Sequence, residues 1–214
     1  MVMSFRYVHV MSTGQVANGL RARQAELART AVLDAVIEAL EHGELDELTM
    51  PQVAKAAGLS LRTLYRYFPS REELLHAAGA EIQARLALPI GIGAPEDIVT
   101  TFWSASERLA HAPELARALV RTTAGRAAHA PTRSARVEAI HAALEPLVDD
   151  LPGDRARQVA GVIAHLCSST AWVTISDESH LDPVDARQGV RWALTVLLDA
   201  LRAEQSTTTE EKTR

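Results

Sequence analysis

Residues 48–75 read LTMPQVAKAAGLSLRTLYRYFPSREELL, which is the pattern of two short helices joined by a tight turn. Apolar residues recur at helical spacing up to Ala57, and Gly58 can adopt the left-handed backbone that ends a helix. Ser60 is then a favourable N-cap for a second helix, which Pro69 ends. The pattern therefore predicts a helix-turn-helix whose second helix begins at Ser60.

The same stretch carries a local positive charge. Between Leu48 and Arg71 the sequence holds Lys55, Arg62 and Arg66 but no Asp or Glu. The whole chain of 214 residues has a formal net charge of -5, so the basic surface is confined to this part. A confined basic surface favours binding of DNA at one place over general attraction to polyanions. Because one such element offers few phosphate contacts, we expect two copies of the chain on one DNA site.

The stretch resembles the DNA-binding domain of TetR-family transcriptional regulators. The signature positions of that family are filled by Thr49, Val53, Ala54, Ala57, Gly58, Ser60, Thr63, Leu64, Tyr65, Tyr67, Phe68, Ser70 and Leu74. Arg71 stands where the family usually has lysine, which keeps the charge. The resemblance implies an all-α fold of about nine helices, with a three-helix DNA-binding domain followed by a helical bundle for ligand binding and dimerisation.

Breaks in the pattern predict how the chain divides. Residues 1–20 are expected to be disordered or a start-site extension, with Met1, Met3 and Met11 as alternative starts. Residues 21–75 form the DNA-binding domain, residues 76–204 the ligand-binding and dimerisation domain, and residues 205–214 a disordered tail. A helix over 70–88 connects the two domains. Further helices are expected at about 23–42, 95–110, 113–129, 132–149, 153–176 and 183–204, separated mainly by proline and glycine.

The resemblance also implies how each residue of the helix-turn-helix meets DNA. Arginine can pair with two acceptors of guanine, and threonine or leucine can contact a thymine methyl group. Base edges are expected to be read by Leu61, Arg62 and Thr63. Phosphates are expected to be contacted by Thr49, Lys55, Ser60, Tyr65, Arg66, Tyr67 and Arg71.

Two apolar helices near the C-terminus are expected to form the dimer interface, as in the family. Their apolar residues repeat at helical spacing, which also fits an ordinary intrachain core, so both alternatives stay open at this point. The residues expected at the interface are Val159, Val162, Ile163, Leu166, Val190, Leu194, Leu197, Leu198 and Leu201.

A small-molecule effector pocket in the middle helices is implied by the resemblance and by no motif. Aromatic or polar side chains would line an otherwise aliphatic cavity. The candidates are Phe102, Trp103, Arg121, Thr122, His141, His165 and Trp172.

Other classes of function find little support in the sequence. There is no phosphate-binding glycine loop, HExxH or GxSxG, so we expect neither an enzyme nor a cofactor, and histidine spacing predicts no metal site. A single Cys and the lack of a long apolar run favour a cytoplasmic protein with no membrane partner. The alternatives are a helical-bundle enzyme acting on a hydrophobic substrate, a TetR-like fold without effector control, and an interaction module without DNA binding.

Overall fold

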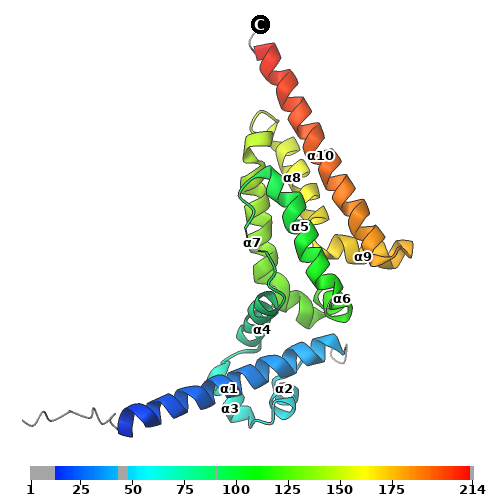
Figure 1. The fold of residues 1–214 in the computed structure, drawn as a ribbon. Coiled ribbons are helices and arrows are strands. Elements are labelled where there is room, and N and C mark those ends of the chain that lie inside the picture. Colours follow the sequence, from blue (N-terminus) through cyan, green and yellow to red (C-terminus); the bar gives the residue numbers. More distant parts are fainter. Residues whose placement is uncertain (1–12, 43–47, 90, 213–214) are drawn as a thin grey trace, which may run out of the picture.

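The computed structural model describes residues 13–42, 48–89 and 91–212, and these residues form ten α-helices and no strand (Figure 1). The predicted all-α class is confirmed. The helices are α1 Thr13–Glu41, α2 Met50–Ala56, α3 Leu61–Tyr67, α4 Arg71–Arg85, α5 Pro95–Ala110, α6 Pro113–Arg121, α7 Thr123–Val148, α8 Gly153–Leu166, α9 Ser169–Ser179 and α10 Pro183–Lys212.

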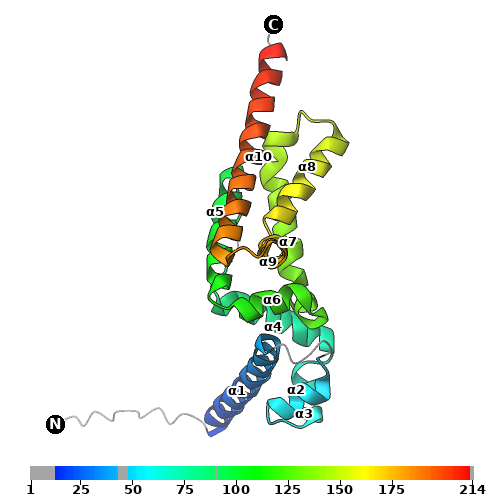
Figure 2. The same cartoon turned by 90° about the vertical axis from the view of Figure 1, so that its right-hand side faces the viewer.

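The helices are arranged as a small N-terminal group and a longer bundle. In both views α1, α2 and α3 lie together at one end, and α4 leads from them to the bundle (Figures 1 and 2). Helices α5, α7, α8 and α10 run along the bundle, while α6 and α9 cross it near the end that faces α1 (Figure 2). Because α4 and α6 both pack against α1, the bundle contacts the N-terminal group at two places.

Apolar side chains of α1 to α4 hold the N-terminal group together. Val32 and Val36 of α1, Leu64 of α3 and Leu74 of α4 are all inaccessible to solvent. Phe68 is also buried, and the guanidinium of Arg29 lies 4.5 Å from the centre of its ring. Burial of this many large side chains fixes the direction of the short helix α3 relative to α1.

The backbones of α4 and α7 approach each other closely at Gly79. A Cβ atom added to Gly79 of α4 would lie 1.9 Å from the carbonyl oxygen of Ala128 in α7. Only glycine allows the two backbones to come this near. His129, the next residue of α7, lines a cavity of the bundle that is described below.

Both ends of the described chain are more helical than expected. Helix α1 begins at Thr13, so residues 13–20 belong to it, while residues 1–12 lie outside the described part. No proline interrupts the sequence between Thr13 and Glu41, which explains the longer helix. The expected disordered tail is also wrong for residues 205–212, which continue α10, and the Gln205 amide donates a hydrogen bond to the carbonyl of Pro146.

Two expected helix boundaries in the bundle are wrong. Pro131 does not end a helix, because α7 runs through it with the proline ring on its exposed side, where a lost backbone hydrogen bond costs less than in the core. The expected helix over 153–176 is instead divided into α8 and α9, and this division makes ten helices out of nine. The Ser168 hydroxyl caps α9 by accepting a hydrogen bond of 3.2 Å from the Ala171 amide.

No single helix in the described ranges is long and apolar enough to cross a membrane. Helices α8 and α9 reach that length and hydropathy only when taken as a pair, and they are bent by 66° at the break between them.

Candidate nucleic-acid interface

The turn between α2 and α3 is built as the sequence predicts. Gly58 has a φ of 67°, which is the left-handed conformation expected at the end of a helix. The Ser60 hydroxyl accepts a hydrogen bond of 3.1 Å from the Thr63 amide and lies 2.8 Å from the Thr63 hydroxyl. The Thr63 hydroxyl is therefore engaged with the cap, and its methyl group is the part left for other contacts.

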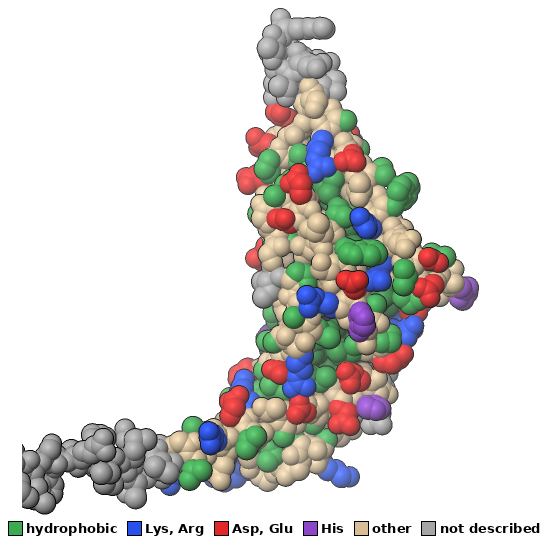
Figure 3. Space-filling view, viewed as in Figure 1, with side chains coloured by type: hydrophobic (Ala, Val, Ile, Leu, Met, Phe, Trp, Pro, Cys, Tyr) green, Lys and Arg blue, Asp and Glu red, His purple; other side chains and the backbone are tan. Residues whose placement is uncertain are grey.

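The outer face of α3 carries polar and basic side chains together with the apolar Leu61. Leu61, Arg62, Tyr65 and Arg66 are exposed, whereas Leu64 between them is buried. Lys and Arg side chains project from the lower edge of the molecule, where α1 to α3 lie, while acidic and basic side chains are mixed over the rest of this face (Figure 3). This face can present hydrogen-bond donors to an anion without moving the core.

Arg66 and Tyr67 form a local pair. Arg66 Nη2 donates a hydrogen bond of 2.9 Å to the Tyr67 hydroxyl, and its guanidinium lies 4.9 Å from the centre of the Tyr67 ring. This bond uses a lone pair of the hydroxyl, so the Tyr67 O–H remains a donor for a phosphate.

Besides Ser60, which caps α3, three residues expected at phosphates lie outside this helix. Lys55 is exposed at the end of α2. Thr49, also exposed, donates its amide and hydroxyl to Gln52 Oε1 at 3.0 and 2.5 Å. Arg71 is half-buried, and its Nε donates a hydrogen bond of 2.7 Å to the carbonyl of Leu48. Arg71 therefore ties the start of α4 to the start of α2, a structural role that the sequence did not predict.

A cavity of about 120 Å³, partly open to solvent, lies in the bundle and is lined by residues of α4, α5, α7 and α9 and of the α4–α5 and α8–α9 connections. Phe102 and Trp172 are the two expected pocket residues that line it. Trp103 instead packs against α10, with the guanidinium groups of Arg187 and Arg191 lying 5.0 and 5.1 Å from its ring centre. One residue turns a helix by about 100°, so Phe102 and Trp103 face different neighbours.

The remaining expected pocket residues also lie elsewhere. Thr122 caps α7, because its hydroxyl accepts a hydrogen bond of 2.9 Å from the Gly125 amide. Arg121 pairs with Asp177, as described below, and His141 and His165 are exposed. Polar residue type alone did not identify the lining of the cavity, because it does not reveal which side of each helix faces inward.

Polar residues of α7 that the sequence analysis missed face the cavity. His129, Thr132 and Arg136 line it together with Gln83 of α4. The Thr132 hydroxyl donates a hydrogen bond of 2.8 Å to Gln83 Oε1. His129 Nε2 and Arg136 Nε are buried and have no hydrogen-bond partner among the described residues. Residues 129, 132 and 136 recur at the spacing of one helical face, and this spacing in the sequence predicts that their side chains lie on the same side of the helix.

Burial shifts the pKa of three groups at the cavity. Burial, followed by the nearby charges of Arg136 and Arg133, lowers the pKa of His129 to about 4. Burial also lowers the pKa of Arg136, although a guanidinium stays charged in proteins. Burial raises the pKa of the Cys167 thiol to about 11, against the opposing effect of Arg136. At neutral pH the cavity therefore holds a neutral imidazole, a neutral thiol and one positive charge.

His129 should make folding stability dependent on pH. Its folded-state pKa of about 4 lies below the ordinary value of 6.5, so the unfolded chain takes up a proton first as the pH falls through that window. We expect the free energy of unfolding to fall by about 1–2 kcal/mol between pH 7 and pH 5 from this group alone. Urea unfolding of the wild type and of His129→Gln at pH 7 and pH 5 measures this change in the free energy of unfolding.

The matched control for that experiment is His141→Gln, which removes an exposed histidine of the same helix. We expect His141→Gln to keep the pH dependence of the wild type and His129→Gln to lose most of it. Equal pH dependence in the wild type and both variants would contradict the assignment to His129.

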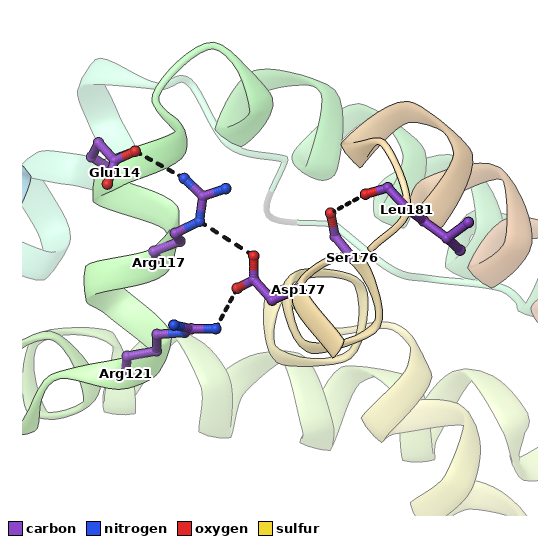
Figure 4. A network of polar contacts seen from close by, with 6 residues as sticks. All are labelled: Glu114, Arg117, Arg121, Ser176, Asp177 and Leu181. Carbon is purple, nitrogen blue, oxygen red and sulfur yellow. Dashed lines mark hydrogen bonds and ion pairs between the residues drawn. The ribbon is translucent and has the colours of Figure 1, made fainter. Parts of the chain in front are cut away.

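Ion pairs join α9 to α6 beside the cavity (Figure 4). The Asp177 carboxylate of α9 lies 2.5 Å from Arg121 Nη2 and 3.5 Å from Arg117 Nε, both in α6. Arg117 Nη1 also lies 2.8 Å from Glu114 Oε1. Since α9 also carries Trp172 of the cavity wall and α6 packs against α1, this network connects the cavity side of the bundle to the N-terminal group.

The expected dimer interface is largely intrachain core. Solvent reaches almost none of Ile163, Val190, Leu194, Leu198 and Leu201, and Val159, Leu166 and Leu197 are half-buried.

Of the residues expected at the dimer interface, only Val162 is exposed, and α10 also exposes apolar residues that were not expected there. Val162 of α8 is 52% exposed, and Trp192 and Val196 of α10 are 69% and 46% exposed. Trp192 and Val196 are four residues apart and share a helix face, which the sequence analysis did not single out.

Comparison with known proteins finds relatives of the helix-turn-helix part of the chain. The family model described as "Bacterial regulatory proteins, tetR family" matches residues 32–78. Two strains of Mycobacterium tuberculosis, CDC 1551 / Oshkosh and ATCC 25618 / H37Rv, each hold an uncharacterized HTH-type transcriptional regulator that is 41% identical over 76 residues. That match covers 32% of this chain and 38% of either relative, so it spans well under half of their length.

Solved structures share the fold over most of the chain. A TetR transcriptional regulator from Rhodococcus sp. RHA1 is 22% identical, with 82% of this chain and 97% of that chain covered and a TM-score of 0.51. NalD, the secondary repressor of the MexAB-OprM multidrug efflux pump in Pseudomonas aeruginosa, is 17% identical, with coverage of 80% and 96% and a TM-score of 0.56. The helix-turn-helix therefore matches that of the TetR family of bacterial regulatory proteins, and over most of its length the chain shares the fold of TetR-family structures.

Proposed function

We propose that this protein is a homodimeric transcriptional repressor that binds a roughly palindromic DNA operator through α3 and releases it when a small molecule fills the cavity. The observation that carries the proposal is the outer face of α3, where Leu61 and Arg62 project from a helix that Ser60 caps and buried Leu64 anchors. A short helix held in this way fits the major groove and presents its first residues to base edges.

The side chains of this face differ in what they can contact. The exposed guanidinium of Arg62 suits the two acceptors of guanine, and Leu61 and the Thr63 methyl suit the methyl group of thymine. Lys55 and the hydroxyl groups of Tyr65 and Tyr67 are donors suited to phosphates. Base contacts would select the sequence, and phosphate contacts would fix the position of the helix on the duplex.

A second copy of the chain supplies the second half-site. One α3 makes few contacts, whereas two copies about 34 Å apart read successive major grooves on one face of DNA. Trp192, Val196 and Val162 are exposed apolar side chains of α8 and α10, the two helices that the family uses to dimerise. Exposed apolar side chains of this size favour association with another protein surface.

Release would follow from the two contacts between the bundle and the N-terminal group. A ligand against His129 presses on the part of α7 where Ala128 meets Gly79 of α4, and this contact has no free space. A ligand against Trp172 acts on α9, which the pairs of Asp177 join to α6. Movement of α4 or α6 relative to α1 would change the separation of the two α3 helices and weaken operator binding.

Repression is the mode that this arrangement favours. A dimer seated across two major grooves covers that stretch of DNA and excludes other proteins from it. A ligand that stabilises a conformation with a different α3 separation then restores access.

Base-reading and phosphate-contacting side chains should differ in their effect on DNA binding. Arg62→Ala is expected to cost about 1–3 kcal/mol on the operator and to relax specificity at one base pair. Lys55→Ala should weaken all duplexes to a similar extent and reduce the salt slope of binding by about one. Mobility shifts with DNA from upstream of the protein's own gene, and with single-base variants of the bound site, measure both effects.

Arg133→Ala is the control, because it removes an exposed arginine of α7, far along the chain from the helix-turn-helix. It should leave operator affinity unchanged. If Arg62→Ala and Lys55→Ala affect all sequences in the same way, the division of roles is wrong. If the wild type binds no site better than random DNA, the proposed function is wrong.

A further inference from the structure

From the cavity we infer that its ligand is a small organic anion, a carboxylate attached to a compact apolar body about the size of one aromatic ring. The inference rests on the proposed function only in treating the cavity as the effector site. It adds the chemical class of the ligand, which neither the family resemblance nor the proposed function supplies.

The size of the cavity limits the body of the ligand. Its volume of about 120 Å³ is comparable to the cavities of about 150 Å³ that accept benzene in other proteins. A long chain or a fused ring system would extend beyond this volume. A single ring or a short branched chain fits the space between them.

The walls of the cavity favour an apolar body. Phe102, Leu109 and Trp172 contribute apolar surface from α5 and α9, and Leu88 and Ile92 close the side formed by the α4–α5 connection. Two aromatic rings among these residues suit a flat ring, which gains from edge or offset contacts with them.

The polar groups of the cavity favour a negatively charged ligand. Arg136 Nε is buried without a hydrogen-bond partner in the described part of the chain, and none of the residues found to line the cavity is Asp or Glu. The Arg136 side chain is half-buried and forms no ion pair with the described residues, so its charge carries a desolvation cost that a bound carboxylate would offset. Arginine also offers two parallel N–H groups, which match the two oxygens of a carboxylate.

His129 supplies a second contact from the same helix face. Its Nε2 is buried without a partner, and residues 129 and 136 are two turns apart on α7. The imidazole is neutral at pH 7, because burial and the two neighbouring arginines lower its pKa to about 4. In the tautomer with the proton on Nε2, it can donate a hydrogen bond to the ligand without adding a charge.

Benzoate and benzamide form a matched pair of probes, since they are similar in size and differ in charge. Isothermal titration should find that the wild type binds benzoate more tightly than benzamide, on the order of tenfold or more, because hydrogen bonds between ions are the stronger kind. Tryptophan fluorescence provides a second readout, since Trp172 lines the cavity. Equal affinity for the two probes, or no binding of benzoate, would overturn the inference.

Three variants locate the charge that is responsible. Arg136→Gln should lose the preference for benzoate, Arg136→Lys should retain part of it, and Arg126→Gln, an exposed change on the same helix, should retain all of it. Circular dichroism establishes that each variant folds. If Arg136→Gln does not fold, Arg136→Lys and the two probes on the wild type still decide the matter. A preference that survives in folded Arg136→Gln would contradict the inference.

Operator binding is measured separately, so the two proposals can fail independently. DNA binding without a preference for benzoate would overturn the ligand class alone. A preference for benzoate in a protein that binds no DNA would overturn the proposed function and leave the ligand class in place.

Discussion

Gly79→Ala is expected to lower the free energy of unfolding by about 1–3 kcal/mol or more, because it forces a methyl group into a contact between two backbones. The added Cβ would lie 1.9 Å from the carbonyl oxygen of Ala128 and 2.8 Å from its carbonyl carbon. Neither atom is the end of a flexible side chain, so α4 and α7 must move apart. The side chains packed at this contact would then lose part of their burial.

Urea unfolding of the wild type and Gly79→Ala measures the effect, with Gly161→Ala as the matched control. Both glycines lie inside helices, but a Cβ at Gly161 would meet no atom within 4 Å. Alanine favours a helix by up to about 1 kcal/mol over glycine, so Gly161→Ala should leave stability unchanged or raise it. Equal effects of the two substitutions would show that the α4–α7 approach is looser than described.

Trp192→Asp is expected to dissociate the proposed dimer and, with it, to abolish the proposed operator binding at protein concentrations that saturate the wild type. Trp192 is 69% exposed in the single chain and lies one turn from Val196, so it can fill the centre of an interface. Loss of a central tryptophan typically costs more than about 2 kcal/mol, and burying a carboxylate in its place adds to that cost. Sedimentation equilibrium measures the dissociation constant directly.

The control for the dimer is Leu27→Asp, which replaces an apolar residue of α1 with 71% exposure by the same acidic side chain. The Leu27→Asp variant should have the same molecular mass in solution as the wild type. A wild type that is monomeric, or a Trp192→Asp variant that remains dimeric with unchanged affinity, would contradict the assignment of this face to the dimer.

The N-terminal group could be predicted from the sequence because its helix ends are encoded by single residues. Gly58, Ser60 and Ser70 each have a conformation or a hydrogen bond that the local sequence requires, and the structure contains all three. The break at Ser168 has the same kind of signal, a serine that caps the next helix. Pro131 shows the limit of such signals, since a proline on the exposed side of a long helix does not end it.

The outward face of α10 could not be predicted, because both of its sides carry large apolar residues. Val190, Leu194 and Leu198 repeat at helical spacing, and so do Trp192 and Val196. Only the tertiary packing, which buries the first set and exposes the second, separates core from surface. The lining of the cavity poses the same problem, since Phe102 and Trp103 are neighbours and only one of them faces inward.

The central claim, that α3 reads DNA as one half of a symmetric pair, is tested most directly by selection from a pool of random duplexes. We predict that the wild type enriches a palindromic site with half-site centres about one helical turn, or 34 Å, apart. Arg62→Ala should enrich a site that is degenerate at one position of each half-site. Failure of the wild type to enrich any sequence over the starting pool, or enrichment of the same site by Arg62→Ala, would contradict the claim.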